Sequence, residues 1–272
     1  MQAVTLGPAG TYSHRAAGAV ADEVAFRESV TAIVEAVVAG EFGRGVVPVE
    51  NSIEGSVTES LDALADDGVA VLREVVTPIR HALLAQSSDF SLVASHSQAL
   101  AQCREYLERE HPDCRREAVA STARGVARAR EDDGVAAIGH PANATEAEPT
   151  LSVLAEDIQD RSSNATRFLV VGPESKRSAA GGKTSAVVYP AANYPGLLLE
   201  LLEAFADRDI NLTRVESRPS GERLGDYLFH VDFEAGLYED RAAAAVDAVR
   251  DMVAEEGWVR VLGSYDTEHV VA

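Results

Sequence analysis

Three side chains of different chemistry follow one another at Thr166, Arg167 and Phe168, where small and polar residues give way to an apolar run ending at Gly172. They offer a hydroxyl, a guanidinium and an aromatic ring. The apolar run predicts a buried strand, and the three residues fall at its beginning. Because ligands of α/β proteins usually bind at a sheet edge, this stretch is a candidate catalytic or binding site.

A glycine-rich turn follows the short strand expected at residues 4–6 and precedes an alanine-rich helical segment. Gly10 lets the backbone approach a ligand, while Thr11 and Ser13 can cap the helix and leave its N–H groups facing an anion. An ordinary capped turn between strand and helix has the same spacing. The glycines fit neither the dinucleotide fingerprint nor the Walker pattern, so no nucleotide cofactor is implied.

A polar interruption at Glu50, Asn51 and Ser52 follows the strand expected at residues 46–47. A carboxylate, an amide and a hydroxyl in so short a stretch are more than a turn requires. They are therefore candidates for a site at the same sheet edge as the glycine-rich turn. The alternative is an Asn/Ser turn followed by a helix cap.

Two further stretches place hydroxyl groups between an expected strand and an expected helix. Ser95 can cap a helix that also carries Gln102, so a hydroxyl and an amide could face one ligand. Ser121 and Thr122 repeat the arrangement at the next strand. His96 is interpreted as a solvated turn histidine rather than a catalytic residue.

Strands and helices alternate through residue 172, and one of the expected helices covers residues 95–110. This alternation predicts a parallel sheet flanked by helices, as two lobes with a cleft between them. The polar segment 173–182 is interpreted as a linker. Beyond it the pattern predicts the βαββαβ order of a ferredoxin-like domain. The elements of that domain are expected at residues 184–189, 195–208, 210–217, 226–233, 240–255 and 259–262.

The amino-acid composition indicates which kinds of partner the protein can bind. Among 272 residues, 44 Asp and Glu against 24 Lys and Arg give a formal charge of -20, and Lys176 and Lys183 are the only lysines. Such a surface should repel nucleic acid and anionic membranes. It suits a salt-rich cytoplasm, where ions screen the repulsion. We expect a cytoplasmic protein with Cys103 and Cys114 as free thiols, no metal site and no membrane span.

Five motifs in this order resemble prephenate dehydratase with a C-terminal ACT regulatory domain. They are GPAGTYSH at 7–14, VVPVENSIEGSV at 46–57, SHSQAL at 95–100, TRF at 166–168 and ESRP at 216–219. The resemblance implies a catalytic domain over residues 1–175, shaped like a two-lobed periplasmic binding protein, with lobes at about 1–78 plus 160–175 and at 79–159. It implies an ACT domain over residues 184–272. With the acidic composition, it suggests a halophilic archaeal source.

The family removes water and carbon dioxide from prephenate to give phenylpyruvate, without metal or organic cofactor. By resemblance Thr166 is the catalytic threonine, and we expect its hydroxyl to donate a hydrogen bond to the departing oxygen. The expected catalytic residues are Glu50, Asn51, Ser95, Gln102, Thr166, Arg167 and Phe168. The expected substrate-binding residues are Gly10, Thr11, Ser13, Ser52, Ser121 and Thr122. Arg167 either holds a substrate carboxylate or pairs with Asp157 or Asp160.

The resemblance also implies feedback by L-phenylalanine, bound between the ACT domains of a homodimer or homotetramer. The residues expected to bind this effector are Asn193, Pro195, Gly196, Leu197, Leu198, Glu216, Ser217 and Arg218. Two other functions stay open on the sequence. One is an arogenate dehydratase, whose substrate carries an ammonium group in place of the keto group. The other is an ACT-linked amino-acid sensor without catalysis.

Overall fold

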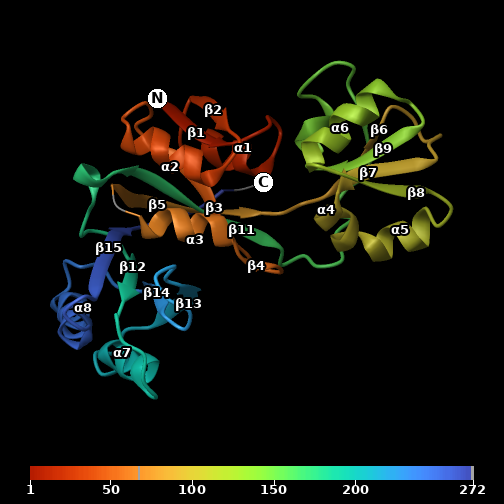
Figure 1. Cartoon of the computed structure of the whole chain (residues 1–272). Helices are drawn as coiled ribbons and strands as arrows, with labels where there is room; N and C mark the ends of the chain where they lie inside the picture. Colours follow the sequence, from red (N-terminus) through yellow and green to blue (C-terminus); the bar gives the residue numbers. More distant parts are fainter. Residues whose placement is uncertain (67, 271–272) are drawn as a thin grey trace.

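Three β-sheets, each with its own helices, organise the chain (Figure 1). The structure is a computed structural model that describes residues 1–66 and 68–270. Two of the sheets form the two lobes of the N-terminal part, and the third forms a separate C-terminal body. No helix in the described part of the chain is long and apolar enough to cross a bilayer.

The first lobe contains a mixed sheet in the order β16-β5-β11-β3-β1-β2, with β4 paired to the end of β3. Strands β1, β2 and β3 are joined through helices and run parallel, whereas β11 returns from the other lobe and runs antiparallel to β3 and β5. The sheet is therefore mixed, and the expectation of a parallel sheet is wrong for β11. The elements are β1 (Gln2–Leu6), α1 (Tyr12–Gly18), β2 (Glu23–Arg27), α2 (Val30–Val38), β3 (Gly45–Asn51), β4 (Gly55–Ser56), α3 (Thr58–Ala65), β5 (Val69–Pro78), β11 (Ala165–Pro173) and β16 (Thr267–His269).

The second lobe has a five-stranded mixed sheet in the order β10-β6-β9-β7-β8. The helix expected over residues 95–110 is divided at Cys103, which belongs to neither of the two helices formed. The elements are β6 (Ala82–Ala85), β7 (Leu92–His96), α4 (Ser97–Gln102), α5 (Arg104–Glu110), β8 (Arg115–Val119), α6 (Thr122–Glu131), β9 (Val135–Gly139), η1 (Pro141–Ala144) and β10 (Ser152–Ala155).

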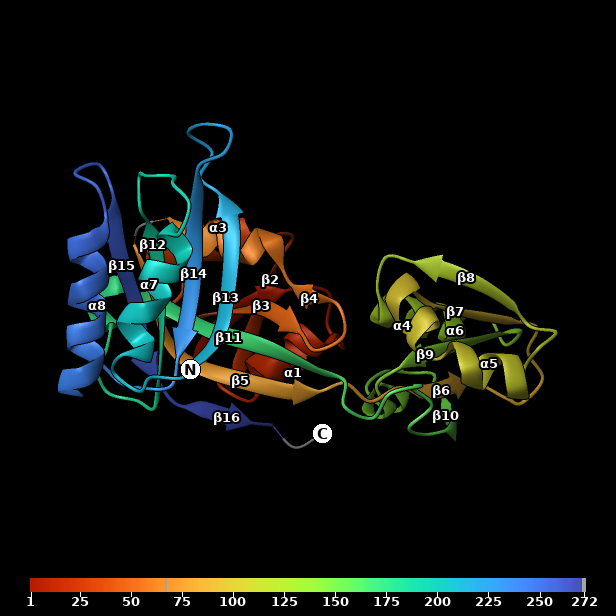
Figure 2. The same cartoon turned by 90° about the horizontal axis from the view of Figure 1, so that it is seen from below.

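The chain crosses between the lobes twice. It leaves the first lobe after β5 and returns before β11, and both views show these extended segments as the covalent connection between the lobes (Figures 1 and 2). The two crossings lie side by side, because the Ile79 N–H donates to the Asn164 carbonyl at 2.8 Å. Residues near both crossings can therefore contribute to one site.

The C-terminal body has the predicted βαββαβ order, with an antiparallel sheet in the order β13-β14-β12-β15. Its elements are β12 (Lys183–Tyr189), α7 (Leu197–Ala206), β13 (Leu212–Pro219), β14 (Tyr227–Phe233), α8 (Asp240–Met252) and β15 (Trp258–Tyr265), preceded by η2 (Glu174–Lys176). This arrangement agrees with the fold class inferred from the sequence.

The two faces of this third sheet pack against different partners. Side chains alternate across a strand, so Val188 and Phe229 pack with the helices α7 and α8, while their neighbours Val187 and Leu228 face the first lobe. There they share a core with Val49 and residues around it. The C-terminal body is therefore attached to the first lobe by a buried apolar face.

The last described strand belongs to the first lobe. After β15 the chain turns back, and β16 pairs in parallel with β5 through Thr267 opposite Glu74. Residues 184–272 were expected to be the ACT domain. Within that range, β16 extends the sheet that carries Thr166.

Candidate functional site

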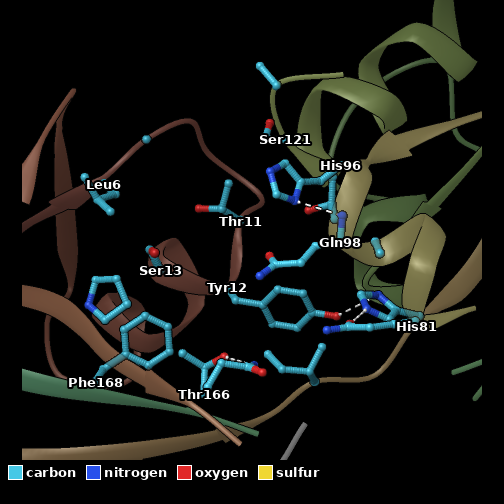
Figure 3. A pocket seen from close by; sticks show the side chains of 18 residues that line it. Leu6, Thr11, Tyr12, Ser13, His81, His96, Gln98, Ser121, Thr166 and Phe168 are labelled. Carbon is cyan, nitrogen blue, oxygen red and sulfur yellow. Dashed lines mark hydrogen bonds between the residues drawn. The ribbon is translucent and has the colours of Figure 1, made fainter. Parts of the chain in front are cut away.

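A cavity of about 360 Å³ lies between the two lobes. In Figure 3, Thr11, Ser13, Thr166 and Phe168 lie on the side of the first lobe, and His81, His96, Gln98 and Ser121 lie on the side of the second. The lining residues are Leu6, Gly7, Thr11, Tyr12, Ser13, Pro48, Asn51, Ile79, His81, His96, Gln98, Ala99, Gln102, Ala120, Ser121, Thr122, Thr166 and Phe168.

The structure brings many of the residues expected at the site to this cavity, although they come from five separate stretches of the chain. They are placed there by the end of β3, the start of β11, the starts of α1 and α6, and the end of α4. The residues expected at the site that line the cavity are Thr11, Ser13, Asn51, Gln102, Ser121, Thr122, Thr166 and Phe168.

The cavity lining combines apolar side chains with neutral polar ones and carries little formal charge. No lysine, arginine, aspartate or glutamate is among the described residues that line it, and His81 and His96 are its only lining groups that can become cations. Thr11 and Ser121 cap α1 and α6 by accepting hydrogen bonds from His14 N and Arg124 N, at 3.3 and 3.0 Å. An anion in the cavity would be held by neutral donors and the positive ends of these helices.

Asn51 fixes the direction of the Thr166 hydroxyl. The backbone amides of Ile53 and Glu54 donate to Asn51 Oδ1, at 3.0 and 3.2 Å, so the other end of the Asn51 side chain is its NH2 group. That group donates to Thr166 Oγ1 at 3.0 Å. The Thr166 oxygen is therefore an acceptor here. Its own proton has no acceptor among the described residues and is available to a ligand in the cavity.

The same reasoning extends across the cleft. The Asn51 NH2 group also donates to Asn164 Oδ1 at 3.0 Å, so the Asn164 NH2 group is the one that donates to Gln102 Oε1 at 2.9 Å. Gln102 Oε1 lies 2.9 Å from His81 Nε2 as well. A continuous series of hydrogen bonds thus joins Thr166 of the first lobe to His81 at the entrance of the second.

Three residues expected at the site are used elsewhere. Ser95 is fully buried and donates to the Ile138 carbonyl at 2.7 Å, so it ties two strands of the second lobe together. Gly10 lies behind the cavity, where its carbonyl accepts from the Asn143 amide at 2.9 Å. Ser52 is exposed and donates to the Ser163 carbonyl at 3.0 Å. These three residues therefore make structural hydrogen bonds and do not line the cavity.

Arg167 and Glu50 lie on the opposite face of the sheet from Thr166 and Asn51, because neighbouring side chains of a strand point to opposite faces. Arg167 is 9% exposed and donates to Glu74 and to Asp232, the latter at 2.6 Å. Glu50 lies 3.6 Å from it. Arg167 therefore joins the first lobe to the C-terminal body. It does not line the cavity, where a substrate carboxylate would bind, and it does not pair with Asp157 or Asp160.

Several polar residues at or beside the cavity were not among the expected site residues, including Tyr12, His81, Gln98 and Asn164. Burial lowers the pKa of His81, an effect that its hydrogen bond with Gln102 partly offsets, so the ring is neutral at pH 7. Burial also raises the pKa of the Tyr12 hydroxyl. His96 lines the cavity too, although its sequence position suggested a solvated turn.

The residues expected to bind an effector lie in two separate places. Asn193 donates to the Gly225 carbonyl at 2.8 Å, and Gly196, with φ of 101°, is the N-cap residue of α7. On β13, Glu216 instead accepts from Ser56 Oγ at 2.9 Å and Arg218 pairs with Asp62 at 2.9 Å. No hydrogen bond or ion pair joins segments 193–198 and 216–218 in the described chain. Glu216 and Arg218 contact the first lobe.

Comparison with known proteins agrees with this architecture. The profile described as "Prephenate dehydratase" matches residues 3–176, and the profile described as "ACT domain" matches residues 191–249. Prephenate dehydratase of Amycolatopsis methanolica is 37% identical over 267 residues, which cover 95% of this chain and 86% of that protein. The enzyme of Methanocaldococcus jannaschii is 39% identical over 239 residues, covering 84% and 86%. The crystal structure of prephenate dehydratase from Arthrobacter aurescens in complex with L-Phe superposes with a TM-score of 0.88 at 36% identity, covering 98% of this chain and 90% of that one.

Proposed function

The chain belongs to the prephenate dehydratase family, and we propose that it converts prephenate to phenylpyruvate with loss of water and carbon dioxide. The observation that carries the proposal is the Thr166 hydroxyl, which Asn51 holds with its proton available to the cavity between the lobes. The C-terminal body is an ACT domain.

The reaction requires little acid–base catalysis by the protein. Prephenate carries two carboxylates and a tertiary ring hydroxyl. When the ring carboxylate leaves as carbon dioxide, its bonding electrons enter the ring, the carbon–oxygen bond breaks and the ring becomes aromatic. Negative charge grows on the departing oxygen, which leaves with the bonding pair and takes up a proton from solvent to become water. A hydrogen bond from Thr166 stabilises that charge, because a threonine hydroxyl titrates too high to act as a matched general acid.

The size of the cavity and the polar groups in its lining suit this chemistry. Its volume of about 360 Å³ lies within the range of ordinary small-molecule sites. The starts of α1 and α6 supply N–H groups for the two carboxylates, and Gln98 adds a side-chain amide. Holding the substrate in one orientation is the main contribution, since aromatisation drives the loss of carbon dioxide.

The test is formation of phenylpyruvate by purified protein in concentrated KCl, with prephenate and arogenate offered in parallel. Thr166→Ala should lower kcat by about 10²–10³-fold, the loss typical of one preorganised donor, and Thr166→Ser should recover part of it. Thr150→Ala, at an exposed threonine outside the cavity, is the matched control. If Thr166→Ala retains turnover within a few fold of wild type, Thr166 has no part in the reaction. Turnover of arogenate alone would reassign the substrate.

Feedback by L-phenylalanine is the second part of the proposal. The complex of the Arthrobacter aurescens enzyme with L-Phe supports it. The exposed apolar side chains Tyr194, Leu198 and Leu199 suit contact with a second ACT domain, so a homodimer or homotetramer is proposed. Calorimetry with L-phenylalanine, with mass measurement in solution, tests both. Binding without any turnover of prephenate would favour an ACT-linked sensor instead.

A salt-rich cytoplasm is the third part of the proposal. The formal charge of -20 and the presence of only two lysines support it, because high salt screens repulsion between acidic side chains. A halophilic archaeon would provide that environment. The dependence of thermal stability on KCl concentration tests this adaptation to salt.

A further inference from the structure

One buried histidine has no part in the chemistry described above. His81 lies between the end of β5 and the start of β6, is 2% exposed and lines the cavity. Its Nε2 is 2.9 Å from Gln102 Oε1 and its Nδ1 is 3.4 Å from the Tyr12 hydroxyl oxygen. Nε2 therefore has a close polar partner, whereas the Tyr12 hydroxyl donates to the Arg80 carbonyl and makes only a long contact with Nδ1.

The position of the proton on His81 follows from its neighbours. Gln102 Oε1 already accepts from the Asn164 NH2 group, so the atom that faces His81 Nε2 is a carbonyl oxygen. Only an N–H can make a hydrogen bond to it, so Nε2 carries the proton. Burial lowers the pKa of His81, and the ring is neutral with Nδ1 unprotonated.

This N–H restrains the orientation of Gln102. The Gln102 carbonyl receives two N–H groups, from His81 and Asn164, while its NH2 group has only the exposed Glu54 carboxylate, at 3.3 Å. Without His81, only the Asn164 N–H and the 3.3 Å contact with Glu54 hold the Gln102 amide, so its orientation is fixed less firmly. A less firmly held Gln102 would in turn loosen Asn164 and the Asn51 NH2 group that also holds Thr166.

The backbone of His81 is held as firmly as its ring. Its N–H donates to Gln159 Oε1 at 2.8 Å, and its carbonyl accepts from the Ile158 N–H at 3.0 Å. Ile158 and Gln159 precede the return crossing to β11. His81 thus connects the outgoing and returning segments between the lobes, so its position depends on how the lobes are arranged.

We propose that His81 is a positioning residue for the dehydration, because its Nε2–H orients Gln102 and, through Asn164 and Asn51, sets the direction of the Thr166 hydroxyl. This inference rests on the proposed function, since Thr166 is taken as the donor to the leaving oxygen. The hydrogen bonds of His81 reach Thr166 only through these three intermediate side chains. Its removal should therefore slow the chemical step without changing the groups that hold the substrate.

The kinetic test compares His81→Leu, which removes the donor, with His81→Gln, whose terminal NH2 group can donate to Gln102. The leucine variant should lose about 10- to 100-fold in kcat with KM unchanged, the scale expected when a catalytic group is slightly misplaced. The glutamine variant should recover most of the loss. His111→Leu, at a histidine that packs on Phe90 and Tyr106 away from the cavity, should behave as wild type.

A spectroscopic test needs no substrate. The ¹⁵N spectrum of histidine-labelled wild-type protein at neutral pH should show His81, assigned by its loss in His81→Gln, as a neutral ring protonated on Nε2. A proton on Nδ1, or an unchanged kcat in a folded His81→Leu variant, would overturn the inference. If wild type fails to convert prephenate, the proposed function is wrong. The spectrum still shows whether His81 Nε2–H donates to Gln102, because that measurement needs no substrate. If His81→Leu does not fold, the spectrum and the glutamine variant decide.

Discussion

Replacing Asp232 by asparagine should destabilise the protein strongly, because this carboxylate joins the ACT domain to the strand that carries Thr166. Asp232 is fully buried and accepts from Arg167 at 2.6 Å, from Arg214 at 2.8 Å and from Ser185 at 2.5 Å. Arg167 and Arg214 are 9% and 8% exposed. Asparagine would leave both without their shared carboxylate.

The expected cost follows from what is left unpaired. Breaking a buried ion pair by removing one partner typically costs about 3–5 kcal/mol, since the remaining charge stays out of water. Arg167 keeps Glu74, but Arg214 has no other carboxylate within ion-pair distance in the described chain. At roughly 2–4 °C per kcal/mol for proteins of similar size, Tm should fall by roughly 6–20 °C.

The pH dependence provides an independent check. Burial alone would raise the pKa of Asp232, but Arg214 and Arg167 outweigh it and hold the pKa well below its ordinary value. A carboxyl group with a lowered folded-state pKa contributes stability that is complete above the unfolded pKa of about 3.9 and is lost as the pH falls through the folded value. Wild type and Asp232→Asn should therefore differ most at neutral pH and converge in strong acid.

Thermal unfolding at several pH values measures both effects. Asp247→Asn removes a surface carboxylate of the same domain, paired with Arg250 and largely exposed, and should leave Tm unchanged. A neutral-pH Tm for Asp232→Asn equal to that of the control would refute the reasoning. It would show that the buried charges contribute nothing beyond what a neutral amide supplies.

Three further outcomes are expected. Stability should rise from low salt to above about 1 M KCl, where the Debye length is about 3 Å; identical melting temperatures would contradict the proposed adaptation to salt. Glu216→Ala should weaken inhibition by phenylalanine without lowering uninhibited turnover. If the 2.9 Å hydrogen bond between Ser56 and Glu216 transmits the inhibition, Ser56→Ala should weaken it as well in the same inhibition assay. Burial, with help from Arg214, lowers the pKa of His230 to about 4. Wild type should therefore lose stability as the pH falls from about 6.5 to 4, and denaturant titrations should show a smaller loss for His230→Leu.

The sequence predicted the parts of the site that follow from local pattern. Thr166 and Asn51 are polar residues next to an apolar strand, Gln102 lies on the helix that follows Ser95, and the structure brings all three to one cavity. The alternation of a strand could also have placed Arg167 opposite Thr166. The partners of Arg167, Glu74 and Asp232, lie far from it in the sequence, so no local pattern indicates them.

Other features depend on contacts that no local pattern encodes. His81 and Asn164 look like ordinary polar residues at the edges of strands, and their role appears only when the two crossings lie side by side. The antiparallel direction of β11 likewise depends on the chain leaving the first lobe and returning. Ser95 has the sequence of a helix cap, but its hydroxyl is buried against Ile138 and His96 takes the capping position.

The return of β16 to the first sheet has a consequence for exchanging regulatory domains. A fragment that ends at Gly182 would lack the strand paired with β5 and would expose Val49 and Leu64, which share a core with the ACT sheet. An unpaired sheet edge also favours association with other chains. During synthesis the first sheet cannot be completed until the ACT sequence has left the ribosome. A hybrid enzyme with a foreign effector domain must therefore also supply a strand equivalent to β16.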